Sequence, residues 1–377
     1  MRALLVTLLI HLTLNPLIYL KGRNVFKDNK LIKNIWSFVF IAELSLFVIV
    51  LLFSDYLPDP FVHFVRVLAT SWFLFVVYCG GIILIYDFIY LIIKRRLSQP
   101  LEIENQPKNF KQPLFIVTLA FVVAVLIHGK YKFEHPVVTH HQIAIDKPAQ
   151  NHESLKVLVA GDLHLGYTID RDDAHRMVNL IMAQNADLIL MVGDIIDASI
   201  KPLIKEQVAD ELKRLSAPLG VYTCPGNHEY RNEAAEKFAF LNAVGIKVLR
   251  DTIIQVDSSF YIAGREDVVI NDRLPLKQLI EVSEIDNTKP LFVLNHTPNN
   301  LDEEMDSNVD LALYGHTHHG QAFPGNLATG LRFELAYGYK KKRNTHFYVT
   351  SGLGLAGPQH RIGTVSEVAL FEVTFND

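Results

Sequence analysis

Five short clusters of aspartate, asparagine and histidine carry the residue types of this sequence that suggest chemistry. They are Asp162-Leu-His164, Gly193-Asp194, Gly226-Asn227-His228-Glu229, Asn295-His296 and Gly315-His316-Thr-His318. Carboxylate, amide and imidazole groups together suit divalent ions such as Mn, Fe or Zn. One carboxylate between two such ions could bridge them. The clusters therefore predict a two-metal site, in which Asp194 is the natural bridge because it stands alone in its cluster.

Each cluster follows a short apolar run, which is typical of a buried strand with functional residues at its carboxyl end. The five runs are LKVLVA, ADLILMV, LGVYTC, KPLFVL and VDLALY. We expect helices at 171–184 and 203–215 between the first strands, with Asp170 as the N-cap of the first helix. The runs HFYVTSGLGL and VSEVALFEVTF predict further strands near the C-terminus. This alternation predicts an α/β domain in which the clusters share one edge.

The first third of the chain has a different composition. Residues 1–135 contain 14 Lys and Arg against 8 Asp and Glu, whereas the remainder contains 22 against 32 and holds most of the histidines. Four apolar stretches reach or approach the roughly 20 residues that cross a bilayer: 2–20, 35–53, 66–93 and 113–128. The sequence therefore predicts a transmembrane domain over residues 1–130, a connector with an edge strand at 137–145 over residues 131–153, and a soluble domain over residues 154–377.

The loops between these stretches predict a topology. Loops 21–33 and 94–112 each carry five basic residues, and loop 54–62 carries none. The positive-inside rule places the two basic loops in the cytoplasm and everything after residue 129 outside it. Glu43 and Asp87 lie inside the spans, where a carboxylate indicates either an interhelical hydrogen bond or a transport role.

In order and spacing, the five clusters resemble the calcineurin-like metallophosphoesterases, whose pattern is D-x-H, GD, GNH[DE], a lone H and GHxH. The resemblance covers residues 137–377 and implies an αββα sandwich with two divalent metal ions of unknown identity. It implies that the first ion is bound by Asp162, His164, Asp194 and His318, and the second by Asp194, Asn227, His296 and His316. A metal-bridging hydroxide would then attack phosphorus in line.

The resemblance also implies roles for residues that bind no metal. His228 would stabilise the phosphoryl oxygens or protonate the leaving alkoxide, and Asp197 would orient His228 by a hydrogen bond. Arg361 follows the glycine-rich segment SGLGLAG and is a candidate for binding the substrate phosphate. Glu229 is expected behind the ligands. The basic run 340–343 indicates either a contact with anionic lipid head groups or a solvated loop.

Within this family, the closer likeness is to the membrane-associated branch typified by the bacterial YkuE-like proteins. The segments YGHTHHGQ and SGLGLAGPQHRIG carry it. The chain departs from that branch at His319, where glycine is common, and near Thr364 and Val365, where two prolines are usual. These departures leave the substrate open.

Together, these features predict a membrane-anchored, metal-dependent phosphoric ester hydrolase of the cytoplasmic (inner) membrane that acts on a phosphomonoester, phosphodiester or pyrophosphate. The tether favours a lipid-linked substrate. A pyrophosphatase of a nucleotide-linked lipid precursor is an alternative that requires a cytoplasmic catalytic domain. A non-catalytic, metal-dependent membrane receptor or transport protein is another. The net charge of −4 predicts no nucleic-acid partner, and two cysteines are too few for a disulfide scaffold. The oligomeric state stays open.

Overall fold

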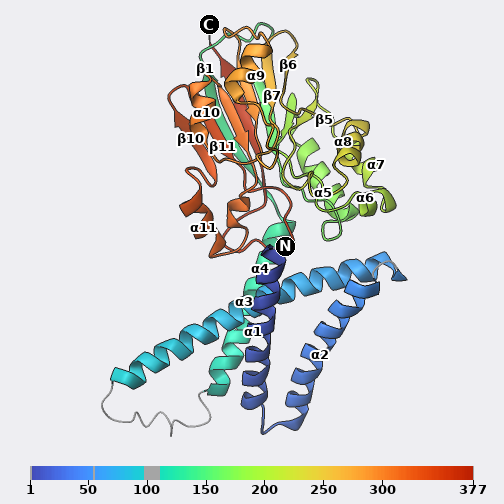
Figure 1. Ribbon diagram of the computed structural model, residues 1–377, viewed down its shortest axis with the longest axis vertical. Coiled ribbons are helices and arrows are strands. Elements are labelled where there is room, and N and C mark those ends of the chain that lie inside the picture. Colours follow the sequence, from blue (N-terminus) through green and yellow to red (C-terminus); the bar gives the residue numbers. More distant parts are fainter. Residues whose placement is uncertain (1, 54–55, 97–110, 377) are drawn as a thin grey trace. The chain divides into compact units, whose positions relative to one another are not determined.

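The computed structural model describes residues 2–53, 56–96 and 111–376 (Figure 1). Most of the predicted basic loop 94–112 therefore lies outside the described residues. The chain divides into two compact units. The first comprises Met1–Lys130 and Gly357–Gln359, and the second comprises Tyr131–Ala356 and His360–Asp377.

Long helices form the first unit, and the protein is a membrane protein. The helices are α1 Arg2–Val25, α2 Lys30–Phe53, α3 Asp59–Arg96 and α4 Lys111–Glu134. Three helices within the described part of the chain are long and apolar enough to cross a membrane, namely α2, α3 and the segment Gln112–Glu134. The predicted first span forms a helix, α1, that contains Pro16. Because α1 is not among those three helices, the predicted count of four spans is not confirmed.

The two acidic residues of the predicted spans both lie at contacts between helices. Lys21 Nζ donates to the carboxylate of Asp87 at 2.5 and 2.7 Å, which joins α1 to α3. Glu43 is buried in α2, and its Oε2 lies 3.8 Å from His11 Nε2 of α1. The interhelical contact predicted for Asp87 is therefore present.

Two six-stranded sheets form the centre of the second unit. The first sheet has the order β1-β12-β2-β3-β4-β5 and the second has the order β10-β11-β9-β8-β7-β6. The strands of the first sheet are β1 Val137–Ile145, β2 Ser154–Ala160, β3 Leu188–Met191, β4 Val221–Thr223, β5 Lys247–Val248 and β12 Glu367–Phe375. Those of the second are β6 Thr252–Val256, β7 Phe260–Gly264, β8 Leu291–Leu294, β9 Leu311–Tyr314, β10 Gly338–Lys342 and β11 Thr345–Val349. The edge strand predicted at 137–145 is confirmed as β1.

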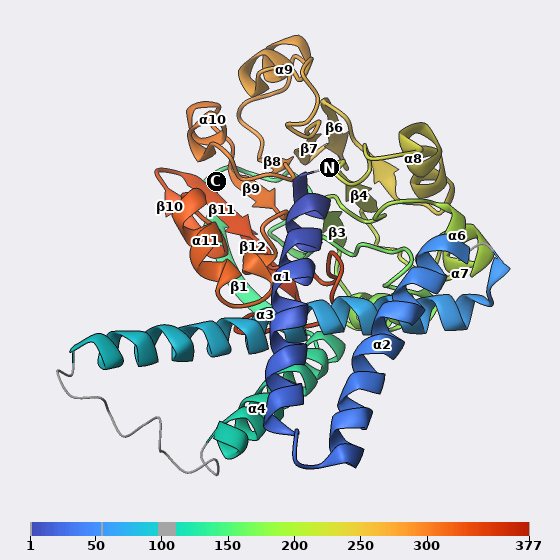
Figure 2. The ribbon, with the colours of Figure 1, turned by 60° about the horizontal axis from the view of Figure 1, so that its bottom comes forward.

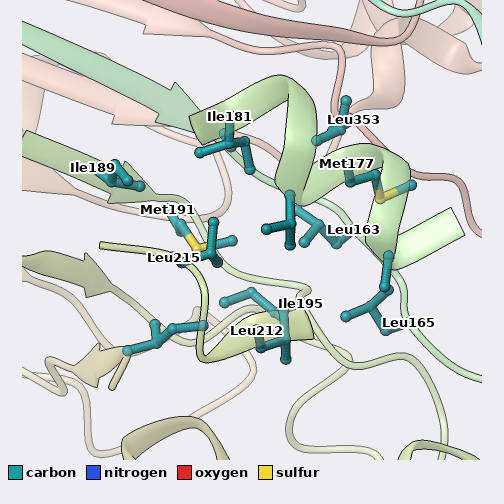
Figure 3. Close-up of a cluster of buried hydrophobic side chains, with 14 of the residues drawn as sticks. Leu163, Leu165, Met177, Ile181, Ile189, Met191, Ile195, Leu212, Leu215 and Leu353 are labelled. Atoms are coloured by element: carbon teal, nitrogen blue, oxygen red, sulfur yellow. The ribbon is translucent and has the colours of Figure 1, made fainter. Parts of the chain in front are cut away.

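Apolar side chains pack the sheets into layers. Val157 and Leu190 of the first sheet share a buried cluster with Phe292 and Leu313 of the second, so one core lies between the sheets. A second core lies between the first sheet and its helices (Figure 3), which are α5 Arg171–Met182, α6 Lys201–Lys205, α7 Val208–Leu212 and α8 Ala234–Ala243. A third core lies under α9 Leu276–Val282 and α10 Leu301–Asp306. The predicted α/β class is confirmed, with helices on the outer faces of two packed sheets.

Local sequence signals explain where some helices begin and end. The side chain of Asp170 accepts from the backbone N–H of Asp173, and the Asp173 side chain accepts in return, so α5 begins at the predicted cap. The single helix expected at 203–215 is wrong. Gln207 has a φ of +56°, a left-handed conformation that cannot continue an α-helix, and it separates α6 from α7.

The basic run 340–343 is part of strand β10 and its turn, so the predicted solvated loop is wrong. Lys340 Nζ donates to Glu334 at 2.8 Å, and Lys342 Nζ donates to Asp302 at 2.7 Å. Arg343 pairs with Asp306 at 3.2 Å. Because neighbouring acids pair with most of this charge, the run is a weak candidate for binding anionic head groups.

Candidate metal centre

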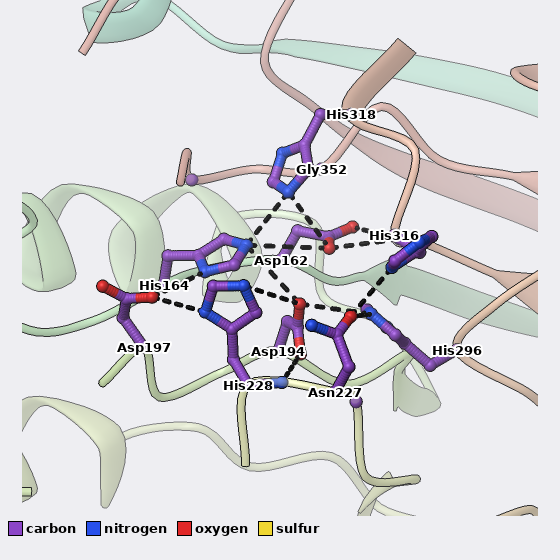
Figure 4. A network of polar contacts seen from close by, with 12 residues as sticks. Asp162, His164, Asp194, Asp197, Asn227, His228, His296, His316, His318 and Gly352 are labelled. Carbon is purple, nitrogen blue, oxygen red and sulfur yellow. Dashed lines mark hydrogen bonds and ion pairs between the residues drawn. The ribbon is translucent and has the colours of Figure 1, made fainter. Parts of the chain in front are cut away.

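Side chains from both sheets converge beyond the carboxyl ends of β2, β3, β4, β8 and β9 (Figure 4). The structure brings together all seven predicted ligands and both predicted helpers, which are Asp162, His164, Asp194, Asn227, His296, His316, His318, His228 and Asp197. The five clusters are far apart in sequence, so only the strand order of the two sheets makes them neighbours.

Left-handed backbone conformations turn these side chains toward one another. Asp162, His164, Asp194, His316 and His318 have φ values between 49° and 69°. Residues other than glycine rarely adopt such φ values. Those that do are concentrated at functional sites, where the surrounding structure stabilises the strained backbone. The N–H groups of Asp162 and His164 donate to the carbonyls of Gly193 and Asp194 at 3.0 Å, so the loops after β2 and β3 hold each other.

Two glycines let backbone approach the carboxylates closely. A Cβ atom added to Gly226 would lie 2.2 Å from Asp194 Oδ1. One added to Gly315 would lie 2.5 Å from Asp162 Oδ2. Any side chain at either position would displace a carboxylate, so glycine is required there.

The first group of donors consists of Asp162, His164 and His318. His164 Nε2 lies 3.0 Å from His318 Nε2, and Asp162 Oδ1 lies 3.8 and 3.5 Å from these two nitrogens. Ligands that bind one ion at about 2.1 Å lie roughly 3.0–3.4 Å apart around it. Among the described residues, the buried Nδ1 of His318 has no hydrogen-bond partner. Buried nitrogens facing each other and a carboxylate fit a shared cation.

The second group consists of Asp194, His296 and His316, with Asn227 beside them. His296 Nε2 lies 3.2 Å from Asp194 Oδ2, and Asn227 Oδ1 lies 2.9 Å from His316 Nδ1. His296 Nδ1 lies 2.7 Å from the carbonyl oxygen of Val192. A carbonyl only accepts, so Nδ1 carries the proton and Nε2 keeps its lone pair for a metal.

The pKa values of the buried groups in the centre also favour a bound cation. Burial, assisted by the charge of Asp194, raises the pKa of Asp162 to about 6. Burial by itself would lower the pKa of His296, but the Asp194 carboxylate outweighs it and raises the value to about 10. Burial lowers the pKa of His316 to about 4. The carboxylates likewise raise the pKa of His164 against the effect of burial. They thus favour positively charged imidazoles, and a bound divalent ion would supply that positive charge instead.

His228 is oriented by two hydrogen bonds. Its Nδ1 lies 2.5 Å from Asp197 Oδ1, and its backbone N–H donates to Asp194 Oδ1 at 2.7 Å. Its Nε2 lies 3.9 Å from Asp194 Oδ2, so the free nitrogen faces the donor groups. Burial would raise the pKa of Asp197, but the nearby His164, whose Nδ1 lies 3.6 Å away, and the hydrogen-bonded His228 lower it instead. Asp197 is therefore ionised and holds the proton on His228 Nδ1.

Glu229 lies behind the ligands, as expected from the sequence. It is buried, and its carboxylate accepts from the N–H groups of Asp194, Gly226 and Ile196 at 2.9, 2.8 and 3.0 Å. One side chain thereby joins the loops that follow β3 and β4.

Arg361, the predicted substrate-binding residue, is placed differently. It is fully buried, and its guanidinium donates to the carbonyls of Ser351, Gly352, Gly354 and His318 at 2.7–2.9 Å. A guanidinium surrounded by main-chain carbonyls is not directed at a phosphate. Its contacts instead hold the glycine-rich segment against Asp162, whose carbonyl accepts from the N–H of Gly354.

The sequence did not reveal Lys237, and it singled out His319 without its contact. Lys237 of α8 is fully buried and donates to the carbonyls of Asp197 and His228 at 2.9 and 2.8 Å. No motif marks this lysine. His319 has a φ of +49° and stacks on the Tyr337 ring, with ring centroids 4.4 Å apart. A histidine at this position of the GHTHHG motif was the signal available in the sequence. The stacking contact could not be predicted from it, because Tyr337 is 18 residues further along the chain.

Comparisons with known proteins agree with this centre. Residues 155–320 match the family model of the calcineurin-like phosphoesterases. A transmembrane protein with a metallophosphoesterase domain from Danio rerio is 27% identical over 276 residues, which cover 69% of this chain and 62% of that protein. An uncharacterized metallophosphoesterase of Campylobacter jejuni is 26% identical over 372 residues, 93% of this chain and 94% of the relative.

The uncharacterized metallophosphoesterase YkuE of Bacillus subtilis is 27% identical over 256 residues, 65% of this chain and 88% of that protein. The match to the Danio rerio protein spans less than two thirds of its length, whereas the Campylobacter jejuni match includes most of the N-terminal helices. Residues 155–320 of this membrane protein thus carry a calcineurin-like phosphoesterase domain, and the relatives named metallophosphoesterases support a phosphoester hydrolase.

Proposed function

We propose that this protein is a membrane-anchored phosphoesterase with two divalent ions, which hydrolyses a phosphomonoester, phosphodiester or pyrophosphate. One observation carries the proposal. Asp194 Oδ2 lies 3.7 Å from His164 Nε2 of one donor group and 3.2 Å from His296 Nε2 of the other. A single carboxylate oxygen between two donor sets is the arrangement that a bridged pair of ions requires.

In this proposal each ion has four protein ligands. The first set is Asp162, His164, Asp194 and His318, and the second is Asp194, Asn227, His296 and His316. When bound, the ions would neutralise the charge of the phosphoryl group and lower the pKa of a water molecule toward neutrality. Asp194 keeps the two sets together through its bond from the His228 N–H, which fixes the orientation of the carboxylate.

His228 is the proposed general acid. With its Nδ1 proton held by Asp197 at 2.5 Å, the ring presents Nε2 to the substrate side. From there, a proton on Nε2 passes to the oxygen of the leaving alkoxide, while Asp197 stabilises the charged ring. Such a proton transfer contributes typically 10²–10⁴-fold to the rate.

We further propose that α1 is a fourth span and that the catalytic unit lies outside the cytoplasm at the inner membrane. The five basic residues of loop 21–33 support this topology. A reporter that is active only outside the cytoplasm, fused to the C-terminus, should be active. An active cytoplasmic reporter would instead favour the pyrophosphatase of a nucleotide-linked lipid precursor.

The catalytic proposal is tested with the full-length protein, stripped of metal and reloaded with Mn²⁺, on an aryl phosphate and an aryl phosphodiester. We expect hydrolysis that Asp194→Asn and His228→Ala each reduce strongly. Asp172→Asn and His140→Ala are matched controls, since both residues are exposed and neither belongs to the donor groups. The proposal would be refuted if none of several divalent metals supported activity, or if Asp194→Asn and His228→Ala left the rates unchanged.

A further inference from the structure

Helix α11 (Gly325–Arg332) carries apolar side chains that its own domain does not cover. Leu331 is 91% exposed and Leu327 is 56% exposed. Leu327 and Leu331 are four residues apart and so lie on one face of the helix. No residue of α11, all of which the structure describes, is buried.

Such a helix needs a partner. It has eight residues, two of which are glycines, and glycine is a poor helix former. Helices this short are not stable in water by themselves, and most helical stability in proteins comes from packing of an apolar face. The face of α11 is therefore expected to be covered by an apolar phase outside the domain.

The charge around α11 indicates that this apolar phase is a lipid bilayer. The segment FPGNLATGLRF contains no acidic residue and a single charge, Arg332, although the soluble part of the chain is acidic overall. Arg332 lies over the Phe333 ring, with its guanidinium carbon 5.0 Å from the ring centroid. A helix in a bilayer interface buries its apolar face among the lipids, and a basic side chain such as Arg332 adds attraction to an anionic surface.

A short connector tethers this domain to the membrane helices. The apolar stretch 113–128 within α4 is followed by only eight residues, 129–136, before strand β1 begins at Val137. The domain is therefore tethered to the bilayer that α4 would cross.

Helix α11 is also directly linked to the metal centre. It follows the turn η3 (His318–Gly320), with which it is in contact within the second unit; Figure 2 labels α11 among the orange-red elements of that unit. At its other end, the Phe333 ring packs edge-on against the ring of His316, with centroids 6.1 Å apart. The position of α11 is therefore coupled to that of the ligand-bearing turn.

We propose that α11 inserts Leu327 and Leu331 into the head-group region of an anionic glycerophospholipid bilayer, and that this contact presents the metal centre to phosphoesters of lipid head groups. The membrane contact stands by itself, whereas the substrate class rests on the proposed function.

The contact is tested in full-length protein in nanodiscs of phosphatidylcholine and phosphatidylglycerol. An environment-sensitive fluorophore is attached to Leu331→Cys or, as a control, to Val282→Cys on α9, since Val282 is 64% exposed. The native Cys79 and Cys224 are buried and do not interfere. We expect a lipid-borne nitroxide to quench only the label at 331, and aqueous iodide to quench only the label at 282. Iodide quenching at 331, or protection from both quenchers by a protein partner or a second copy, would overturn the proposal.

The substrate class is tested by comparing Leu331→Ser with Val282→Ser in the same nanodiscs. The rate on phosphatidic acid or phosphatidylglycerol, relative to a soluble aryl ester, should fall about tenfold in Leu331→Ser, the lower end of what burial of one leucine contributes. Val282→Ser should leave the ratio unchanged. An unchanged ratio in Leu331→Ser, or hydrolysis of the aryl ester without any lipid hydrolysis, would overturn the lipid assignment. Failure to hydrolyse either ester would instead refute the proposed function and leave the fluorescence result to decide the contact.

Discussion

Replacing Asp197 by asparagine separates two roles of this carboxylate: it orients the His228 ring, and its charge stabilises the protonated ring. The amide keeps the shape of the carboxylate but loses its charge, and the 2.5 Å contact with His228 Nδ1 becomes a neutral one. A hydrogen bond to a charged group contributes about 1.5–3 kcal/mol. At 1.4 kcal/mol per factor of ten, we expect kcat to fall about 10- to 100-fold, with little change in KM.

The pH dependence has a definite sign. Burial lowers the pKa of His228, and the hydrogen bond and charge of Asp197 counteract part of this. Removing that charge lowers the pKa further. A general acid works only in its protonated form, so the variant should lose activity at a lower pH than the wild type as pH rises. Bound cations lower the pKa of His228 in the wild type and in Asp197→Asn alike. The informative quantity is therefore the difference in that pKa between the two proteins.

The assay uses a series of aryl and alkyl phosphates with the full-length Mn²⁺-loaded protein. A poor leaving group depends most on protonation, so the loss in Asp197→Asn should grow as the leaving group becomes more basic. Asp172→Asn is the control, because Asp172 is exposed on α5. An equal loss for all leaving groups without a pH shift, or an effect on KM alone, would refute the role of His228 as the acid.

Four further outcomes are expected. Glu229→Ala leaves three backbone N–H groups without their acceptor and should cost about 3 kcal/mol or more in denaturant unfolding, whereas the exposed Glu236→Ala should cost little. Arg361→Lys should lower thermal stability because one ammonium cannot reach all four carbonyls, with KM nearly unchanged; a large KM change with unaltered stability would restore the predicted phosphate contact. Mn²⁺ should raise the unfolding temperature of the wild type in a concentration-dependent way and raise that of Asp194→Asn much less; equal shifts would place the metal elsewhere. In the metal-free protein, the raised pKa of His296 contributes stability that is complete below about pH 6.5 and lost as pH rises toward about 10, so an unfolding titration should show this loss in the wild type and not in His296→Gln.

Much of this protein is readable from its sequence because the signals are local. Long apolar stretches determine the membrane helices, and short apolar runs that end in polar clusters determine the strands next to the centre. The helix at 203–215 was misjudged because the left-handed conformation of Gln207 has no strong local signature. The short strands β5, β6, β7 and β10 were missed because two to five residues carry too little pattern and their pairing partners are distant.

The sequence by itself determined which residues lie at the strand ends and, through their order, the kind of chemistry they suit. Only the tertiary structure decided which donor groups lie next to one another, because that depends on how β2, β3 and β4 of one sheet oppose β8 and β9 of the other. The same holds for Arg361, whose burial against carbonyls no motif reveals, for the buried Lys237, and for the uncovered face of α11. A sequence specifies which groups are present, whereas burial and charge partners arise from segments that meet only in the folded chain.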